Sequence, residues 1–222
     1  MTGSVVPAPR LRRELARLGP RQQLGAGRLP RRLLQLTAGL LLYGLTLAMI
    51  IRSTLGNAPW DVLHQGLALH LPLTIGQAVV VMSIVVLLLW IPLRELPGLG
   101  TVANAIVVGF AADFFLWLID EPSSLWLRIA LVAGGVLLNG AATALYIGAQ
   151  FGPGPRDGLM TGLHRRTGLS LRLVRTSLEV AVVVIGFFLG GTLGLGTVLY
   201  AVAIGPLAQL MLPWAIVDLG ER

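Results

Sequence analysis

The hexapeptide GNAPWD at residues 56–61 recurs as GPGPRD at residues 152–157, so that one pattern, Gly-x-x-Pro-x-Asp, appears twice at a spacing of 96 residues. The surrounding chain matches at the same spacing without a gap, and GLGTV at residues 98–102 is repeated at residues 194–198. Shared apolar composition accounts for leucine opposite leucine, but not for a constant register of proline, aspartate and the Gly-Leu-Gly-Thr tetrad. The sequence therefore contains two copies of one structural unit.

The composition indicates the solvent in which the chain folds. Of its 222 residues, 55% are hydrophobic and 12% are charged, which is too apolar for a soluble globular domain. Residues 34–51 carry no charge, and a hydrocarbon core of roughly 30 Å requires about 20 such residues. This run exceeds the apolar region of a signal peptide, about 7 to 15 residues, and its equivalent recurs at residues 131–147. The sequence thus predicts an integral membrane protein with a retained first helix.

The basic residues are unevenly distributed. All 17 are arginine, and eight of them fall within the first 32 positions. Residues 1–33 are expected to form a disordered cytoplasmic tail, because basic residues before a span usually stay on the cytoplasmic side. A nucleic-acid-binding arm is disfavoured, since no aromatic residues are interleaved with these arginines. The chain has no cysteine, which excludes disulfides, thiolate nucleophiles and cysteine-based metal sites.

Hydropathy along the chain predicts three long spans in each copy of the unit. Membrane repeat 1 is expected at residues 34–120 and membrane repeat 2 at residues 127–217, followed by a cytoplasmic C-terminus at residues 218–222. The six predicted spans lie near residues 34–53, 73–93, 98–118, 128–148, 170–190 and 195–217.

The arginines also predict the orientation of the two repeats. An odd number of spans per repeat makes the copies face opposite sides of the bilayer. In agreement, residues 52–76, expected outside, carry one arginine, whereas residues 148–175, expected inside, carry five. The expected fold is all-α and polytopic, with six long transmembrane helices in two inverted repeats of three, each with a short broken or re-entrant helix. Both termini are expected to be cytoplasmic.

The two Gly-x-x-Pro-x-Asp segments have the form of loops that open short helices. Proline suits the first helical position, and a carboxylate in the first turn gains about 0.3 to 1 kcal/mol from the helix dipole. The segments either start ordinary helices at the membrane surface, or dip toward the midplane, where a carboxylate costs about 2.5 to 3.5 kcal/mol and is retained for a site. On the second interpretation the candidate substrate-binding residues are Asn57, Pro59, Asp61, Pro155, Arg156, Asp157 and Glu179.

Glu179 differs from the others because it lies in the middle of the fifth predicted span, where its repeat equivalent is Ser83. An intramembrane carboxylate is functional by default, yet Arg175 stands four residues earlier and can pair with it on one helix face. Both interpretations stay open. The histidines show no metal-ligand spacing, so no metal, cofactor or catalytic residue is expected.

The second copy of the motif, continued as GPGPRDGLM at residues 152–160, resembles the YczE-type bacterial integral membrane proteins, which are relatives of the YitT group. The resemblance covers roughly residues 34–217 and leaves out the arginine-rich tail. It implies a multi-pass protein of the bacterial cytoplasmic membrane, sometimes linked to the production of secondary metabolites, and brings no catalytic residues. The first copy has Trp60 where the second has Arg156, which argues against two equivalent sites.

Three classes of function follow, and the favoured one is a small secondary transporter or channel for a small solute or ion bound between the paired segments. A non-transporting accessory or scaffold protein is the alternative, docking a partner or anionic lipid through cytoplasmic arginines. An intramembrane hydrolase with Asp61 and Asp157 as a dyad is least favoured, because no oxyanion donors accompany them. Six spans in 222 residues make a thin bundle that is compatible with a homodimer. The arginines of the alternative are Arg156, Arg165, Arg166, Arg172 and Arg175.

Overall fold

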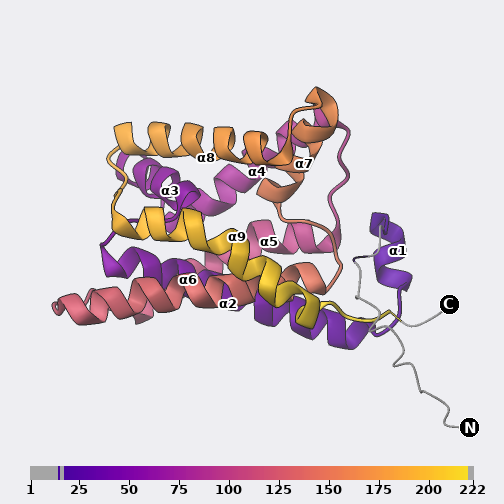
Figure 1. The fold of residues 1–222 in the computed structure, drawn as a ribbon, viewed down its shortest axis with the longest axis horizontal. Coiled ribbons are helices and arrows are strands. Elements are labelled where there is room, and N and C mark those ends of the chain that lie inside the picture. Colours follow the sequence, from indigo (N-terminus) through magenta and orange to yellow (C-terminus); the bar gives the residue numbers. More distant parts are fainter. Residues whose placement is uncertain (1–14, 16–17, 220–222) are drawn as a thin grey trace, which may run out of the picture.

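The computed structural model describes residue 15 and residues 18–219, and the regular secondary structure of these residues is entirely helical (Figure 1). The helices Pro59–His70 and Pro155–Thr167 each begin with proline at the first helical position. Side-chain caps begin two of the longer helices, where Thr74 accepts a hydrogen bond from Gln77 N and Ser170 accepts one from Leu173 N. The described helices are α1 (Pro20–Gly25), α2 (Leu29–Ser53), α3 (Pro59–His70), α4 (Ile75–Leu93), α5 (Leu99–Leu118), α6 (Leu125–Gly148), α7 (Pro155–Thr167), α8 (Leu171–Phe188) and α9 (Leu195–Ala215).

Five of the described helices are long and apolar enough to cross a bilayer, namely α2, α4, α5, α6 and α9. The sixth expected span corresponds to α8, which has 18 residues and three charged side chains. The all-helical membrane fold is therefore confirmed, while the sixth crossing stays a prediction. Large apolar side chains cover the outward faces, as expected for contact with lipid, among them Phe110, Trp117, Phe188 and Trp214.

The helices form two layers (Figure 1). In one layer, α2 packs between α5 and α6, and α6 also packs against α9. In the other layer, α4 and α8 flank the two short helices, and α3 and α7 each contact both of them. Each short helix packs most extensively on the long helix of the opposite half of the sequence, α3 on α8 and α7 on α4. The two halves of the chain are therefore interleaved in the second layer.

The first long helices of the two halves, α2 and α6, run in opposite directions. Gln35, near the start of α2, donates to the Leu145 carbonyl near the end of α6 (3.0 Å), and Asn139, in the middle of α6, donates to Thr46 further along α2 (2.7 Å). Helix α2 is thus antiparallel to its repeat equivalent α6. Gln35 also donates to the Ala215 carbonyl at the end of α9 (2.7 Å), so α2 begins and α9 ends at the same end of the molecule.

Local structure also recurs at the 96-residue offset. Gly196 N donates to the Leu55 carbonyl, and Gly100 N donates to the Phe151 carbonyl, each at 2.8 Å. Both donors and both acceptors are repeat equivalents. Each bond ties the loop before a short helix in one half to the start of the last helix in the other half.

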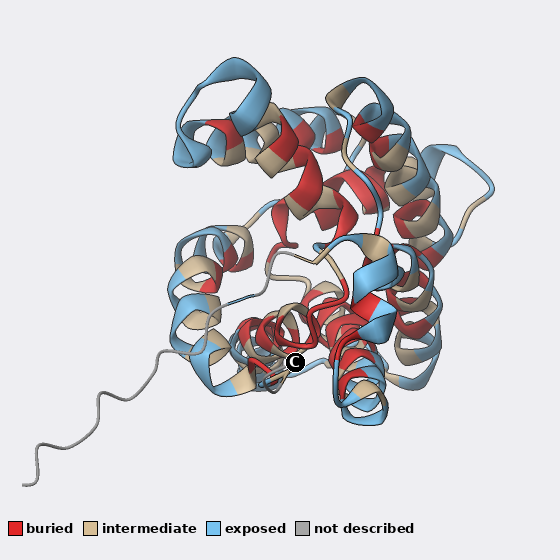
Figure 2. Ribbon diagram, turned by 90° about the vertical axis from the view of Figure 1, so that its right-hand side faces the viewer, coloured by how far each residue is buried: buried red, intermediate tan, exposed pale blue. Residues whose placement is uncertain are grey.

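The layers meet along one edge and lie apart along the other (Figure 2). At the first edge α4 packs against α5, and Asp113 of α5 accepts hydrogen bonds from the Thr74 hydroxyl and from Gly76 N (2.8 Å). At the opposite edge, the backbones of α8 and α9 approach each other at few positions. Buried residues concentrate on the helix faces between and within the layers, as the red segments in Figure 2 show.

Part of the tail that we expected to be disordered is ordered. Residues 1–14, 16 and 17 lie outside the described residues, but residues 20–25 form α1 and residues from Leu29 onward belong to α2. The physical reason is Arg32, which is fully buried and donates to the carbonyls of Ala149 (2.9 Å), Gln150 (2.8 Å) and Gln23 (2.7 Å). Its guanidinium satisfies carbonyls at the end of α6, which have no partner within that helix, and holds α1 beside them.

Candidate functional site

Both short helices begin with the same loop geometry. Gly56 and Gly152 have positive φ angles of 115° and 100°, a conformation that glycine adopts without strain. A Cβ on Gly56 would also lie 2.5 Å from the Gly194 nitrogen, so no side chain fits there. The loops then lead directly into Pro59 and Pro155 at the first helical position. The local reading of the two motifs as helix starts is therefore confirmed.

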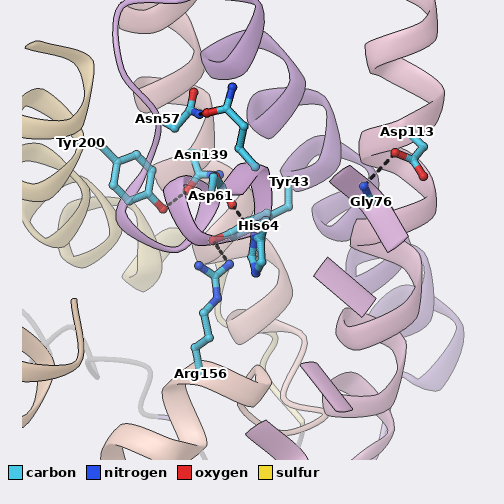
Figure 3. A network of polar contacts seen from close by, with 10 residues as sticks. Tyr43, Asn57, Asp61, His64, Gly76, Asp113, Asn139, Arg156 and Tyr200 are labelled. Atoms are coloured by element: carbon cyan, nitrogen blue, oxygen red, sulfur yellow. Dashed lines mark hydrogen bonds and ion pairs between the residues drawn. The ribbon is translucent and has the colours of Figure 1, made fainter. Parts of the chain in front are cut away.

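The Arg156 side chain extends from the start of α7 toward the start of α3 (Figure 3). Pro59, Trp60 and Pro155 are buried. The Arg156 guanidinium lies over the Trp60 ring at 5.5 Å and over the Tyr43 ring at 5.8 Å, and it donates to the Tyr43 hydroxyl at 3.0 Å. Arg156 thereby connects α7 with α3 and with α2 in the other layer. The expectation that Arg156 belongs to an exposed cytoplasmic cluster is wrong, because its side chain is directed into the protein.

The two aspartates of the motifs have different partners. Asp61 and His64 are both buried and pair at 3.1 Å. Asp157 instead accepts a hydrogen bond from the Tyr146 hydroxyl of α6. Each carboxylate is thus bound by a residue of its own repeat. These contacts give no support to a dyad in which Asp61 and Asp157 share a proton. His64 went unassigned in the sequence, because a lone histidine on an apolar helix carries no signal.

Asn57 is part of a clasp between the first loop and the connection from α8 to α9. Its side-chain amide donates to Gln65 Oε1 at 2.7 Å, and its backbone nitrogen donates to the Thr192 carbonyl at 3.1 Å. Thr192 N in turn donates to the same Gln65 oxygen at 2.7 Å. These contacts assign Asn57 a structural position beside the site.

A cavity of about 290 Å³ lies between the two layers, beside the starts of the short helices. Of the seven candidate substrate-binding residues, Pro59, Arg156, Asp157 and Glu179 line it. The other three do not: Asn57 lies in the clasp, Asp61 pairs with His64, and the Pro155 carbonyl accepts from Trp90 Nε1 at 3.0 Å. The cavity receives side chains from α2, α3, α5, α6, α7, α8 and α9.

The cavity combines charged, aromatic and apolar side chains. Glu179 pairs with Arg175 at 2.9 Å, as one of the two interpretations of Glu179 expected, and both residues line the cavity. All three tyrosines of the chain line it as well: Tyr43, Tyr146 and Tyr200. These tyrosines were not predicted as site residues from the sequence. Tyr43 carried a signal, because it lies in the middle of α2, whereas tyrosine in a membrane protein is enriched at the two interfaces. Tyr146 and Tyr200 lie nearer the ends of α6 and α9 and carried no such signal.

The lining of the cavity is chemically mixed. Among residues 18–219, no group of three or more histidine or carboxylate side chains is placed to hold a metal ion. The lining supplies hydrogen-bond donors and acceptors, ring faces and aliphatic surface around a central space, the usual constitution of a small-molecule site.

Comparison with known proteins gives sequence relatives. The chain is 41% identical to an uncharacterized protein of Haemophilus influenzae over 79% of this chain and 83% of the relative. It is 31% identical to the uncharacterized membrane protein YczE of Bacillus subtilis, over 81% of this chain and 84% of the relative. The uncharacterized protein YyaS of the same organism is 27% identical over 79% and 89%, respectively. No solved structure matches the chain.

These relatives confirm the resemblance to the YczE-type proteins and, with the apolar helices, show that this is a membrane protein. The profile of a family of unknown function matches residues 30–213, which leaves out the arginine-rich segment and the last residues. Since this match covers most of the sequence, the chain belongs to that family of unknown function, DUF6198.

Proposed function

We propose that this protein is a small secondary transporter whose substrate binds in the cavity between the two layers. The observation that carries the proposal is the meeting of the paired Gly-x-x-Pro-x-Asp segments beside one cavity, with Arg156 and Asp157 in its wall. Interrupted segments at corresponding positions of two repeats are the usual place of a transporter's binding site.

The proposal includes six crossings, with the repeats inverted across the bacterial cytoplasmic membrane and both termini inside. Three features support this topology. Helices α2 and α6 are antiparallel repeat equivalents, α2 begins and α9 ends at the same end of the molecule, and Arg165 and Arg166 of α7 follow the side that the positive-inside rule assigns to the cytoplasm. In this arrangement the short helices dip into the membrane from opposite faces, and their buried starts lie near its midplane.

Charged residues in the cavity fit a site more readily than a scaffold. A charge within the bilayer costs about 2.5 to 3.5 kcal/mol on insertion scales, and Arg156, Asp157, Arg175 and Glu179 all line this space. Burial of that many charged groups without a ligand would be an unfavourable way to build a passive bundle.

The accessory role has less support from the contacts. It required the five arginines of residues 156–175 to form one docking surface. Arg156 instead lies against Tyr43, Arg175 pairs with Glu179, and Arg165 pairs with Glu95. Arg166 donates to the Pro92 carbonyl at 3.0 Å. Four of the five side chains therefore make contacts within the protein.

The absence of cysteine from the chain makes the transport proposal testable. A single cysteine at Ala208, which lines the cavity from α9, is compared with one at Val202, which is 70% exposed on the outer face of the same helix. In right-side-out and inverted vesicles, a water-soluble methanethiosulfonate reagent is expected to modify the cysteine at position 208 from both sides, and the cysteine at position 202 from neither.

The outcome depends on whether the cysteine at position 208 is modified from one side of the membrane or from both. Modification from both sides means that the cavity is hydrated and reaches each aqueous phase, as transport requires. If the cysteine at position 208 reacts from one side only, or not at all, the cavity does not connect the two phases and the transport proposal is wrong.

A further inference from the structure

The open edge between α8 and α9 is encoded by differences between the repeats. At the closed edge, Gly76 of α4 faces Gly109 of α5 so closely that a Cβ on Gly76 would lie 2.1 Å from the Gly109 carbonyl oxygen. The repeat equivalents of these two glycines are Arg172 in α8 and Gly205 in α9. An arginine side chain in place of a hydrogen prevents the same close approach. Asp113, which bonds α5 to α4, is also replaced, by Gln209.

Few atoms lie close to Gly205 of α9. Around Gly205, the nearest atom that an added Cβ would meet is Nη1 of Arg175, at 3.5 Å. Arg175 and Glu179 of α8 and Ile204, Gly205 and Ala208 of α9 all line the cavity. The wall of the cavity therefore includes both of the helices, α8 and α9, whose backbones approach each other at few positions.

This edge borders the lipid. The outer face of α8 exposes Val180, Val184 and Phe188, and that of α9 exposes Val198 and Val202. Apart from polar side chains such as Arg172 and Gln209, which are exposed on these helices, the outer surface beside the opening is apolar. In the proposed topology a molecule can therefore pass between the two helices from the hydrocarbon region.

The inner part of the cavity favours an anionic group. The Arg156 guanidinium contacts the Tyr43 hydroxyl and the ring faces of Tyr43 and Trp60, all of which are uncharged. Guanidinium has five donors in a fork that matches a carboxylate or a phosphate. Asp61 and Asp157 are near enough to attract Arg156 electrostatically, but each has a different hydrogen-bond partner, His64 and Tyr146 respectively. Glu179 pairs with Arg175.

We infer that the substrate of this cavity is an amphiphile, whose carboxylate or phosphate head binds Arg156 and whose apolar chain leaves through the opening between α8 and α9 into the bilayer. The inference rests on the proposed function and narrows its substrate class. The volume agrees with it, because about 290 Å³ lies at the lower end of the usual range of about 300 to 1,000 Å³ for small-molecule sites. The cavity encloses a head group and the first part of a chain, and the aliphatic lining on the α8 and α9 side is formed by Leu178, Ile204, Ala208 and Leu212.

The test measures protection of a cysteine at Ala208 from alkylation, with the protein in lipid nanodiscs. The probes are dodecyl phosphate, inorganic phosphate and dodecanol, which separate the amphiphile from its head and from its chain. Dodecyl phosphate is expected to slow alkylation about tenfold and saturably, as a charge-assisted contact would, and the other two probes are not. A cysteine at Leu169, exposed between α7 and α8, controls for access of the reagent.

Two pairs of variants assign the effect to the proposed contacts. Arg156→Gln is expected to abolish protection by dodecyl phosphate, whereas Arg165→Gln, which removes an exposed arginine of the same helix, leaves it intact. Gly205→Leu, which narrows the opening, is expected to reduce protection, and Val202→Leu on the outer face of α9 is not.

Each other outcome contradicts the inference in a recognisable way. Equal protection by inorganic phosphate would mean a soluble anion, and equal protection by dodecanol would mean that the head group is not recognised. Protection by none of the three, with the cysteine still reactive, would exclude this class of substrate. All three results leave the transport proposal standing, because that proposal depends on modification from both sides of the membrane.

Discussion

Arg156 and Trp60 occupy the same position of the two repeats, and the guanidinium of one lies 5.5 Å from the centre of the other's ring. The position at which the two motifs differ most is therefore the position at which they touch. A second arginine here would place two like charges side by side, and a second tryptophan would remove the Arg156 cation from the wall of the cavity. The difference between the motifs thus makes the two helix starts complementary.

This contact is expected to couple the two short helices energetically. In a double-mutant cycle with Arg156→Gln and Trp60→Leu, the single changes are expected to be non-additive by about 0.5 to 1 kcal/mol, the range of a cation–π pair at a partly exposed site. The measurement is the free energy of unfolding in detergent. Trp60→Phe keeps a ring face and serves as the control, with most of the coupling retained. If the effects of the two single changes on the free energy of unfolding are additive, the two side chains lie close together without an energetic coupling.

The closed and open edges predict opposite results for the same substitution at equivalent positions. Gly109→Ala places a methyl group 2.5 Å from the Gly76 carbonyl oxygen and 2.6 Å from Val80 Cγ2. Overpacking of this kind costs about 1 to 3 kcal/mol, so the thermal midpoint is expected to fall.

Gly205→Ala is the matched control, because the added methyl group meets only Arg175 Nη1 at 3.5 Å. Its stability is expected to stay within about 0.5 kcal/mol of the parent. Similar losses in both variants would mean that α8 and α9 pack as closely in solution as α4 and α5 do.

The short helices could be predicted from the sequence because their signals are local. Proline at the first helical position and a glycine with positive φ before it act within a few residues, so a hexapeptide suffices to locate each start. The duplication was likewise visible, and residues such as Leu55 and Phe151 make equivalent hydrogen bonds in the two halves.

The cavity could not be predicted, because its wall comes from seven helices whose neighbours are fixed by packing alone. Arg156 illustrates the difficulty, since the sequence placed it both among the candidate substrate-binding residues and among the cytoplasmic arginines, and only the position of Tyr43 shows that its side chain has a partner inside the protein. The replacement of Gly76 by Arg172 was present in the sequence. It acquires a meaning only when α4 is known to pack on α5 and α8 to lie apart from α9.

Arg32 is expected to be essential for stability, in contrast to its neighbour Arg31. Arg32 is fully buried against carbonyls of α6 and of the segment before α2, whereas Arg31 is exposed. A hydrogen bond to a charged group contributes about 1.5 to 3 kcal/mol, so Arg32→Leu is expected to cost at least about 3 kcal/mol. Size-exclusion chromatography after heating measures the loss, and Arg31→Leu is the control. Equal stability of the two variants would show that the order of α1 and of the start of α2 does not depend on this guanidinium.

The sixth crossing can be tested with two single cysteines, at Leu169 before α8 and at Leu193 after it, both of which are exposed. The 18 residues of α8 span about 27 Å, enough for a hydrocarbon core, and pairing of Arg175 with Glu179 removes the net charge from its middle. An impermeant maleimide is expected to label position 193 in intact cells and position 169 only in inverted vesicles. As a control, cysteines at Glu121 and at Arg94 report the two sides of α5 and are expected to follow positions 193 and 169, respectively. Labelling of both α8 positions from the same side would place α8 on the membrane surface and would remove the inverted arrangement on which the two-sided cavity depends.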